Sequence, residues 1–335
     1  MALLLLKMTI DDTDKKILFE LDRGARRSVK DIAKKLGLKR DTVAYRIKQL
    51  EKNEVINGYY TIIDYSKLGY VLARLYIKLQ KTTPQLEEEA INHLMKEKSS
   101  LTIYQTEGTY DIAAGFLVKK IEDFKKVLLR FQEKYQKYVN HYETAIFYEF
   151  RHYFKNYLVE PKLRNYGFFS IGKSDEVKLD DTDKKILWMI ARDAKKSLLD
   201  MANELEMTSM AVRYRIKQME KSKVILGYRA LINLTKCSYE YYKLDLTLDE
   251  VTNLKGLQEF CLQHPNVTYE DRAVSSSDFE VDLEMQSNDD FYKLINVLKT
   301  SFPGVIRTYR YYRARKIYKF EYFPLPGDTE NKDIK

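Results

Sequence analysis

The sequence is poor in cysteine, histidine, proline and glycine, and it has no long apolar run. Its 335 residues include 2 cysteines, 4 histidines, 6 prolines and 12 glycines. Cys237 and Cys261 lack CxxC spacing, which argues against a zinc site or a disulfide framework and favours a reducing compartment. Because no stretch approaches the roughly 20 apolar residues of a membrane span, we expect a cytoplasmic protein without a membrane partner.

Residues suited to catalysis are also sparse. His93, His141, His152 and His264 are scattered along the chain, and none has a second ligand-type residue at metal-binding spacing. The cysteines have no neighbouring base, and there is no glycine-rich phosphate loop. The sequence therefore predicts no catalytic residue, no metal ligand and no cofactor, and it disfavours an enzyme.

The two ends of the chain are expected to carry little structure. The opening MALLLLK has an apolar run of about five residues, which is short for a signal peptide and has no positive charge before it. We expect a frayed extension there, with translation starting at either Met1 or Met8. The polar tail at 326–335 is expected to be disordered.

What the chain does contain is a long internal repeat. Residues 11–59 return at 180–228 without a gap, with about half of the positions identical. The octapeptide DDTDKKIL stands in both copies, at Asp11–Leu18 and at Asp180–Leu187. A period of 169 residues is too long for a solenoid and equals the length of a small protein. We therefore predict two fused copies of one module, with a net charge of +9 that favours an anionic partner such as nucleic acid.

Each copy begins with a head of about 50 residues in which we expect three short helices. Aspartate and serine caps open the first two helices, and Gly37 supplies the turn before a third helix at 39–52. This order is the helix-turn-helix pattern, and the strand after each third helix serves as a wing. In the second head Glu206 replaces Gly37, which costs about 1 kcal/mol where the turn needs a left-handed backbone. A plain three-helix bundle is the alternative, and the basic and polar surface of the third helix disfavours it.

Each head is followed by a body of about 100 residues with the order β-α-β-β-α-β. In the first copy, apolar and polar residues alternate over 74–79 as in a half-buried strand, and a Tyr- and Arg-rich strand ends each body. The expected fold class is α+β, with two winged helix-turn-helix domains each followed by a ferredoxin-like βαββαβ domain. The expected bounds are 8–60 for head 1, 61–160 for body 1, 161–177 for a linker, 178–229 for head 2, 230–325 for body 2 and 326–335 for the tail.

Taken together, the head motifs resemble the leucine-responsive regulatory protein / AsnC family of transcription regulators. The motifs D-x-x-D-x-x-I-L, S-x-x-D-I-A, V-x-x-R-I-x-x-L-E and V-I-x-G-Y begin here at Asp11, Ser28, Val43 and Val55. The resemblance covers nearly the whole chain twice, and the head motifs are its specific part. It implies that a winged helix-turn-helix binds DNA, and that the body mediates dimerisation and binds a small effector, often an amino acid. Since family members usually have one head and one body, this chain resembles an internal pseudo-dimer.

The resemblance also implies an effector site in the loop between the middle strands of the body. The family's G-x-x-D stands here as Gly108 and Asp111, with Tyr110 between them. In the second copy Asp278 remains and Ser275 replaces the glycine, which weakens the match there. The alternative is that Gly108 and Asp111 only form a tight turn, and that the bodies serve assembly alone.

The third helix of each head is expected to lie in the major groove, with its N-terminal residues at the base edges. Arg40 is the best base reader, because a guanidinium pairs with O6 and N7 of guanine, whereas Lys39 and Lys48 suit phosphates. Arg46 and Arg215 lie beside the apolar stripe and are expected to brace the head against its neighbour instead. The predicted DNA-binding residues are Lys39, Arg40, Asp41, Ala44, Tyr45 and Lys48 in the first head and Thr208, Ser209, Met210, Arg213, Tyr214 and Lys217 in the second.

Because the two third helices differ, we predict an asymmetric target with half-sites about 10 bp apart or a multiple of that. The first head has 14 basic and 9 acidic residues over 7–59, against 11 and 9 over 176–228, so it is expected to supply more of the salt-dependent affinity. The densest basic run, at 307–319, either contacts nucleic acid or forms an edge strand guarded by charge, and the edge strand is favoured.

The sequence therefore predicts a transcription regulator that binds double-stranded DNA through two non-identical heads. It is expected to pair its bodies within the chain, to form homo-oligomers and to respond to an amino acid or similar effector. One alternative is a sequence-neutral architectural DNA-binding protein. Another is an enzyme similar to the sirohaem decarboxylases of the haem pathway, which resemble this family. Those enzymes rely on a histidine in the second body strand, and neither 101–104 nor 266–269 contains one.

Overall fold

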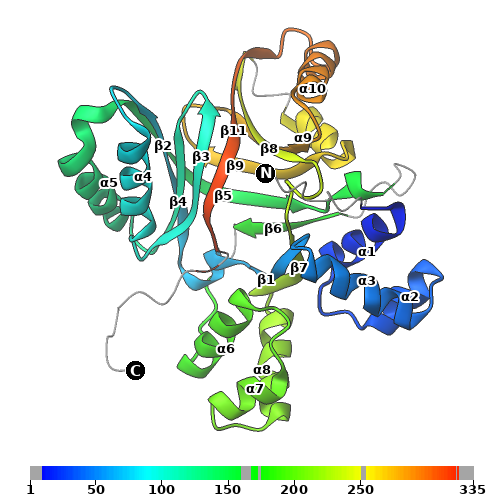
Figure 1. Ribbon diagram of the computed structural model, residues 1–335. Helices are drawn as coiled ribbons and strands as arrows, with labels where there is room; N and C mark the ends of the chain where they lie inside the picture. Colours follow the sequence, from blue (N-terminus) through cyan, green and yellow to red (C-terminus); the bar gives the residue numbers. More distant parts are fainter. Residues whose placement is uncertain (1–9, 160–166, 173–174, 250–253, 322, 324–335) are drawn as a thin grey trace, which may run out of the picture.

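The structure is a computed structural model in which two helical heads are attached to a barrel of strands (Figure 1). The expected extension before Met8 and the expected tail lie outside the described residues, as does part of the expected linker. Within the described ranges, no helix combines the length and the apolar composition that crossing a bilayer requires. The described residues are 10–159, 167–172, 175–249, 254–321 and 323.

Three helices form each head, at the positions that the repeated capping residues predict. In both copies the first helix begins with a reciprocal capping box, at Asp11 and at Asp180, and a serine caps the second helix. The third helix of the first head begins at Arg40, one residue later than expected. The helices are α1 (Asp12–Arg23), α2 (Val29–Leu36) and α3 (Arg40–Lys52) in the first head, and α6 (Asp181–Arg192), α7 (Leu198–Glu204) and α8 (Ser209–Lys221) in the second.

The strands that follow the third helices pair with each other. β1 (Ile56–Ile63) and β7 (Ile225–Ile232) form a two-stranded antiparallel ribbon. Tyr60 lies opposite Arg229, and these two residues occupy equivalent positions in the two copies, so the ribbon is centred on the axis that relates the copies. In Figure 1 the ribbon lies between the two heads and the remaining strands.

The eight long strands of the two bodies close into one barrel rather than two separate sheets. Each copy contributes four adjacent strands, and the copies meet where β11 pairs with β3 and where β5 pairs with β9. The barrel closes where β2 pairs with β5, which leaves each four-stranded sheet with both edges paired. The barrel strands are β2 (Val71–Leu79), β4 (Ile112–Val118), β3 (Ser100–Gly108), β11 (Ile306–Phe320), β8 (Glu240–Leu248), β10 (Phe279–Met285), β9 (Val267–Val274) and β5 (Val139–Tyr153), in spatial order.

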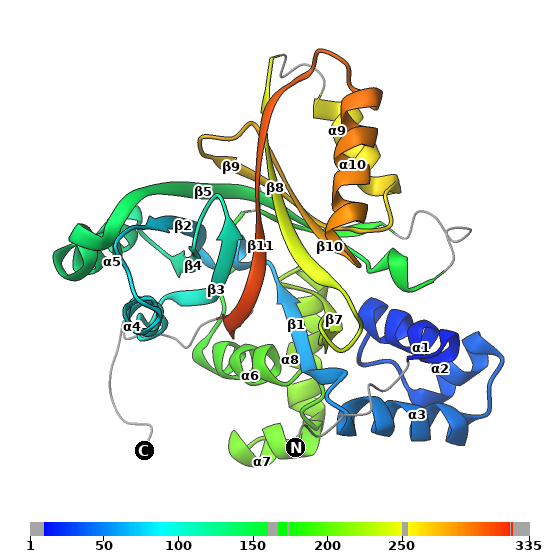
Figure 2. The ribbon, with the colours of Figure 1, turned by 45° about the horizontal axis from the view of Figure 1, so that its top comes forward.

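Helices cover the outer face of the barrel, two from each copy (Figure 2). The apolar side of the strands packs against them and forms one core cluster per copy. A further strand, β6 (Phe168–Gly172), falls within the expected linker and pairs with the last part of β5. The remaining elements are α4 (Pro84–Met95), α5 (Ile121–Tyr135), α9 (Leu254–Gln263) and α10 (Asn288–Ser301), with 3-10 turns at Tyr65–Leu68, Gln136–Tyr138 and Asn156–Leu158.

The polar side of the strands is buried, which corrects the expectation of half-buried strands with a solvent face. Arg74 of β2 is 6% exposed, and Lys243 at the equivalent position of β8 is completely buried. The Lys243 Nζ lies 2.6 Å from Asp271 and 3.0 Å from Asp282, so its charge is neutralised by carboxylates on two neighbouring strands. An alternating pattern shows that a strand has two different faces, but it does not show whether the polar face meets solvent or a closed lumen.

β11 also corrects the interpretation of the basic run at 307–319 as an edge strand. The strand lies between β3 and β8 within the sheet. Its arginines form ion pairs with acids from other strands, Arg310 with Glu143 at 2.5 Å and Arg313 with Glu240 at 2.6 Å. The positive charge therefore matches neighbouring acids instead of guarding an open edge.

Candidate nucleic-acid interface

The third helices present the predicted DNA-binding residues on one open surface of each head. All six residues predicted on α3 are exposed, and so are those on α8 except Ser209, which is half-buried. Tyr45 and Tyr214 occupy equivalent positions and are each 64% exposed, which is high for aromatic side chains. The surface thus carries the mixture of aromatic, basic and hydroxyl groups that contacts bases and phosphates in DNA readers.

Each third helix is held in its head by the packing of its buried apolar side and by one arginine. Val43 and Ile47 of α3 are buried in the first head. The Nη1 of Arg46 lies 2.7 Å from Asp11 Oδ2 and 2.8 Å from Asp14 Oδ1, the two members of the capping box of α1. Arg46 therefore has a structural role, but it braces α3 against α1 within the head and not the head against its neighbour.

The second head repeats this brace atom for atom. Arg215 Nη1 lies 2.7 Å from Asp180 and 2.8 Å from Asp183. Hydrogen bonds from the Asp183 backbone and from Arg215 lower the pKa of Asp180 below its usual value. The two arginines are committed to the fold of the heads, and the exposed residues around them make no such brace.

The heads differ at the N-terminal end of the third helix, where base edges are predicted to be read. Lys39 is the N-cap residue of α3 and makes no side-chain cap, whereas Thr208 at the equivalent place accepts a hydrogen bond from the Ala211 backbone at 3.1 Å. Arg40 at the start of α3 is exposed, and Ser209 stands at that position in α8. The first head presents two cations at this end, and the second presents hydroxyls.

The turn before the third helix is left-handed in both heads. Gly37 has φ of 65°, and Glu206 at the equivalent position has φ of 52°. A side chain in this region is strained by about 1 kcal/mol. The second head therefore carries a local strain that the first head avoids, as its sequence predicts.

The heads are attached crosswise, each to the ribbon strand of the other copy. The Ala25 backbone N donates to Tyr228 O on β7, and the Ala194 backbone N donates to Tyr59 O on β1, both at 2.9 Å. In Figure 1 α1 accordingly lies beside β7 and α6 beside β1. The orientation of each head is therefore set by the other half of the chain.

One anchor breaks this symmetry. Arg229 at the centre of the ribbon donates through Nε to Asp22 of the first head at 2.7 Å, and both side chains are almost completely buried. The other carboxylate oxygen of Asp22 accepts from the Lys155 backbone at 2.9 Å. The equivalent positions in the second head are Tyr60 and Ala191, which cannot form an ion pair. The first head is thus fixed by a charged anchor that the second head lacks.

The residues predicted to bind an effector lie at the β3–β4 turn, where they also have structural roles. Asp111 accepts hydrogen bonds from the Leu79 backbone at 2.7 Å and from Lys78 Nζ at 2.8 Å. Gly108 has φ of 113°, and a Cβ there would lie 2.7 Å from Tyr311 O on β11. Tyr110 is 1% exposed. These contacts explain the glycine and the aspartate as parts of a turn, and effector binding by the three residues stays a prediction.

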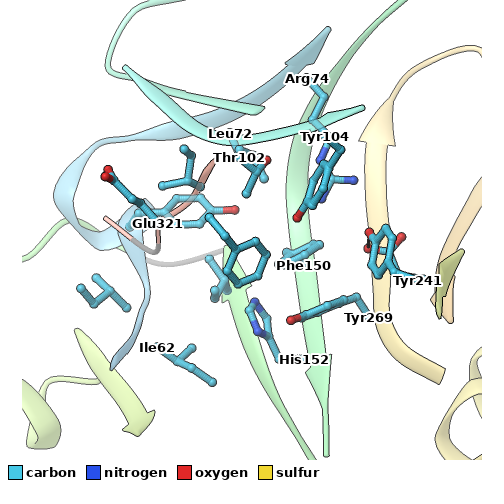
Figure 3. Close-up of a pocket in the computed structure, with 16 residues that line it drawn as sticks. Ile62, Leu72, Arg74, Thr102, Tyr104, Phe150, His152, Tyr241, Tyr269 and Glu321 are labelled. Carbon is cyan, nitrogen blue, oxygen red and sulfur yellow. Dashed lines mark hydrogen bonds between the residues drawn. The ribbon is translucent and has the colours of Figure 1, made fainter. Parts of the chain in front are cut away.

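The sequence did not predict a small chamber inside the barrel (Figure 3). The chamber has a volume of about 50 Å³ and is lined by side chains from both copies. His152 projects into it beside the rings of Phe150 and Tyr269 and is 3% exposed. Only the pairing of distant strands assembles these walls, and a lone histidine in an aromatic strand does not reveal them. Within the part of the chain that the structure describes, no group of three or more His, Cys, Asp or Glu residues is placed to hold a metal ion.

Comparison with solved structures finds a whole-chain match in fold. The crystal structure of the siroheme decarboxylase NirDL covers 92% of this chain and 93% of its own, with a TM-score of 0.61 and 14% sequence identity. A structure of the same enzyme with an iron-uroporphyrin III analogue gives a TM-score of 0.60. At this identity the likeness shows a shared fold alone.

Comparison of sequences identifies the family. The model of the AsnC-type helix-turn-helix domain matches residues 10–51, and a winged helix-turn-helix DNA-binding model matches 179–225. The transcriptional regulator Ptr1 of Methanocaldococcus jannaschii is 34% identical over 122 residues, which cover 36% of this chain and 79% of Ptr1. The transcriptional regulator LrpA of Pyrococcus horikoshii is 34% identical over 119 residues, which cover 36% of this chain and 83% of LrpA. The predicted resemblance is confirmed, and the chain belongs to the Lrp/AsnC family of DNA-binding transcription regulators.

Proposed function

We propose that this chain is a cytoplasmic, sequence-specific regulator that reads one asymmetric DNA site with two non-identical heads. The observation that carries the proposal is the crosswise attachment of both heads to one ribbon, with different side chains at the reading end of each third helix. A head that is oriented by the other half of the chain keeps a fixed spacing to its partner. Two different readers at a fixed spacing favour an asymmetric site over a palindrome.

Within this proposal, the predicted residues of α3 and α8 contact DNA in different ways. Arg40 pairs with guanine, and Lys39 and Lys48 contact phosphates. In the second head Arg213, which is exposed one turn into α8, is the base reader, and Thr208 contacts the backbone of the DNA. The first head then supplies the larger share of the salt-dependent affinity, because it carries more cations.

The remaining parts of the prediction belong to the proposal as well. Each half of the barrel is a ferredoxin-like unit, since the four strands of a copy lie in the order fourth, first, third, second. The heads end near 60 and 229, and the described strands of the body halves, which are predicted at 61–160 and 230–325, form the shared barrel. A small effector such as an amino acid binds at the turn of Gly108, Tyr110 and Asp111 and shifts the association of chains into homo-oligomers.

The test is selection of bound fragments from sheared genomic DNA at about 150 mM salt. It compares the wild type with a variant in which the first head carries the exposed third-helix residues of the second head. The variant combines Lys39→Thr, Arg40→Ser, Asp41→Met and Ala44→Arg, the last of which places an arginine at the position equivalent to Arg213. We expect an asymmetric bipartite motif from the wild type and a change in one half-site only from the variant. A matched control, Lys125→Thr with Lys126→Ser, removes two exposed cations from α5 on the barrel and should leave the motif unchanged.

Two outcomes would contradict the proposal. A clean palindrome would show that the heads read the same sequence. Uniform recovery of all fragments would place the protein among sequence-neutral architectural DNA-binding proteins, because specificity lies in the ratio of specific to non-specific affinity.

A second candidate function is decarboxylation of a tetrapyrrole, which the whole-chain likeness to NirDL favours. The chamber in the barrel has a volume of about 50 Å³, which is far smaller than a tetrapyrrole, so such a substrate would have to lie in a neighbouring groove of about 930 Å³. The absorbance spectrum of the purified protein, alone and after addition of an iron porphyrin, tests this candidate. A stoichiometric Soret band would support it, and its absence would leave the regulator as the single proposal.

A further inference from the structure

His152 is a buried histidine whose hydrogen-bonding groups face the chamber. Among the described residues, neither of its ring nitrogens has a hydrogen-bond partner, although the side chain is 3% exposed. Its ring stands edge-on to Phe150 at 4.6 Å and to Tyr269 at 4.8 Å. A buried polar group without a partner costs about 1–3 kcal/mol, so this arrangement needs a compensating role.

The surroundings of His152 favour an anion. Burial lowers the pKa of His152 well below its usual value, and the charges of Arg229 and Arg74 lower it further. Arg74 lines the same chamber and uses Nη1 to bind Asp271 at 3.1 Å, which engages one edge of a guanidinium that has five N–H donors. Asp282, an acid in the chamber wall, is already neutralised by Lys243 at 3.0 Å. The other acid of the wall, Glu321, lies 3.7 Å from Lys319. The imidazole and the guanidinium are the nitrogen donors of the chamber, beside the hydroxyls of Thr102 and four tyrosines.

The charge of the groove next to the chamber also favours an anion. A groove of about 930 Å³ lies next to the chamber, and Tyr104, Tyr241, Tyr269 and Phe320 line both of them. These rings form the wall between the two spaces, and Tyr104 is stacked on Tyr241 at 5.7 Å. The groove wall has a small excess of positive charge, which favours the approach of an anion. Glu107 and Glu321, which lie outside the wall, pair with Arg313, Arg315 and Lys319. The groove's charged residues are Lys155, Arg313, Arg315, Lys316 and Lys319 against Glu240 and Glu284.

We propose that the chamber is a binding site for a small aliphatic monocarboxylate, and that its ligand acts on the second head alone. The carboxylate accepts hydrogen bonds from His152 and Arg74, and the aliphatic part packs between the aromatic rings. A volume of about 50 Å³ has room for roughly four probe-sized groups, which corresponds to an acid of two to four carbons. This site is separate from the turn at Gly108, Tyr110 and Asp111, and the ligand is recognised by charge and by the aromatic walls.

The effect is one-sided because the chamber adjoins the core of the second head. Ile62 and Ile63 of β1 line the chamber, and they belong to the same apolar cluster as the helices of the second head. The first head has a separate core cluster around α1, α2 and α3. At the chamber wall, Glu321 lies 4.0 Å from Arg192 of α6, and that guanidinium lies over the ring of Trp188 at 4.7 Å. A ligand that moves Glu321, or Ile62 and Ile63 at the end of β1, therefore shifts α6. The first head packs against the start of β1, at Ile56 and Tyr59, and stays on its charged anchor.

The binding test uses the full chain and sodium propionate as the probe, with sodium chloride at equal ionic strength as the reference. Ring signals of the four histidines are followed by NMR, and the fluorescence of Trp188, the single tryptophan of the chain, is followed in parallel. We expect saturable shifts of the His152 signals and of the Trp188 emission, with a Kd on the order of 1 mM for a ligand of this size. Two variants serve as a matched pair. His152→Phe should abolish the Trp188 response. His264→Phe, which alters a histidine that follows α9 and does not line the chamber, should keep it.

The absence of a saturable shift in wild-type His152 would overturn the proposal without reference to any variant, and so would an unchanged response in folded His152→Phe. The effect on DNA rests on the proposed function and has its own readout, footprinting of the two half-sites with and without propionate. Protection of the second half-site should change by several-fold while the first stays constant. Equal change in both half-sites would refute the one-sided action, whereas loss of footprints without propionate would refute the proposed function and leave the binding result intact.

Discussion

The anchor between Arg229 and Asp22 leads to a prediction whose size follows from burial. Both side chains are at most 1% exposed, so Arg229→Met leaves a carboxylate inside the protein with one remaining donor, the Lys155 backbone. Breaking a buried ion pair in this way costs about 3–5 kcal/mol. Since every 1.4 kcal/mol is tenfold in an equilibrium constant, the amides of α1 should exchange roughly 100-fold faster or more.

The chain itself supplies the matched control. The combination Asp22→Ala with Arg229→Tyr installs at the first head the pair that the second head has naturally, Ala191 with Tyr60. This variant removes both charges and leaves only the Lys155 backbone N–H without its acceptor. The loss of that acceptor should lower the stability by about 1–3 kcal/mol. Hydrogen exchange of α1 and α6, read by mass spectrometry, should therefore show partial recovery in α1 and little change in α6. A double variant that opens more readily than Arg229→Met, or a single variant with unchanged exchange, would refute the anchor.

The other predictions concern the turn, the barrel lumen and the reading helix. Glu206→Gly should stabilise the protein by about 0.5–1 kcal/mol in urea unfolding, because it relieves a left-handed side chain, and Gly37→Glu should destabilise it by a similar amount; equal effects of the same sign would contradict this. Burial, helped by the charge of Glu280, raises the pKa of Asp245 to about 8, so the folded state holds a proton that the unfolded state releases near pH 4. Stability from this group should fall as pH rises from about 4 to about 8, and Asp245→Asn should flatten that slope; an unchanged slope would show that Asp245 titrates normally. Lys39→Thr should lower the slope of log K against log salt concentration by about the value of one phosphate contact, without altering the selected DNA sequence. A changed sequence would show that Lys39 contacts a base.

The heads could be predicted from the sequence because their determinants are local. The caps at Asp11 and Asp180, the turn at Gly37 and the apolar spacing of the third helix all act within a few residues, and the structure follows them to within one residue. The strained turn at Glu206 was predictable for the same reason. The repeat supplied a second, independent copy of each pattern.

The barrel could not be predicted in the same way, because its two halves are joined by pairing between residues more than 100 positions apart, β3 with β11 and β5 with β9. The alternation around Arg74 and Lys243 shows that each strand has an apolar face and a polar face. It does not show whether the polar face meets solvent or a closed lumen, because a lumen that supplies ion-pair partners also accepts polar side chains. The basic run of β11 was misread for this reason, since the acids that neutralise it come from other strands. A clue is present in β10, where Glu280, Asp282 and Glu284 alternate with apolar residues and need cations nearby.

Part of the candidate site was likewise beyond the sequence. The exposed residues of α3 and α8 follow from helical periodicity alone, and so does the place of Arg46 beside the apolar stripe, although its partners on α1 do not. The crosswise attachment of the heads does not, because it requires knowing that β1 pairs with β7. The chamber around His152 has the same origin, as its walls come from strands of both copies.

The most direct test of two non-identical heads is the affinity of the full chain for three synthetic duplexes at one salt concentration. One duplex carries the selected site, and the other two carry a palindrome made from the left or the right half-site at the same spacing. We expect both palindromes to bind at least tenfold more weakly, since each mismatched base pair costs about 1–3 kcal/mol. Equal or tighter binding to either palindrome would show that the two heads read the same sequence and would contradict the asymmetric reading proposed for this chain.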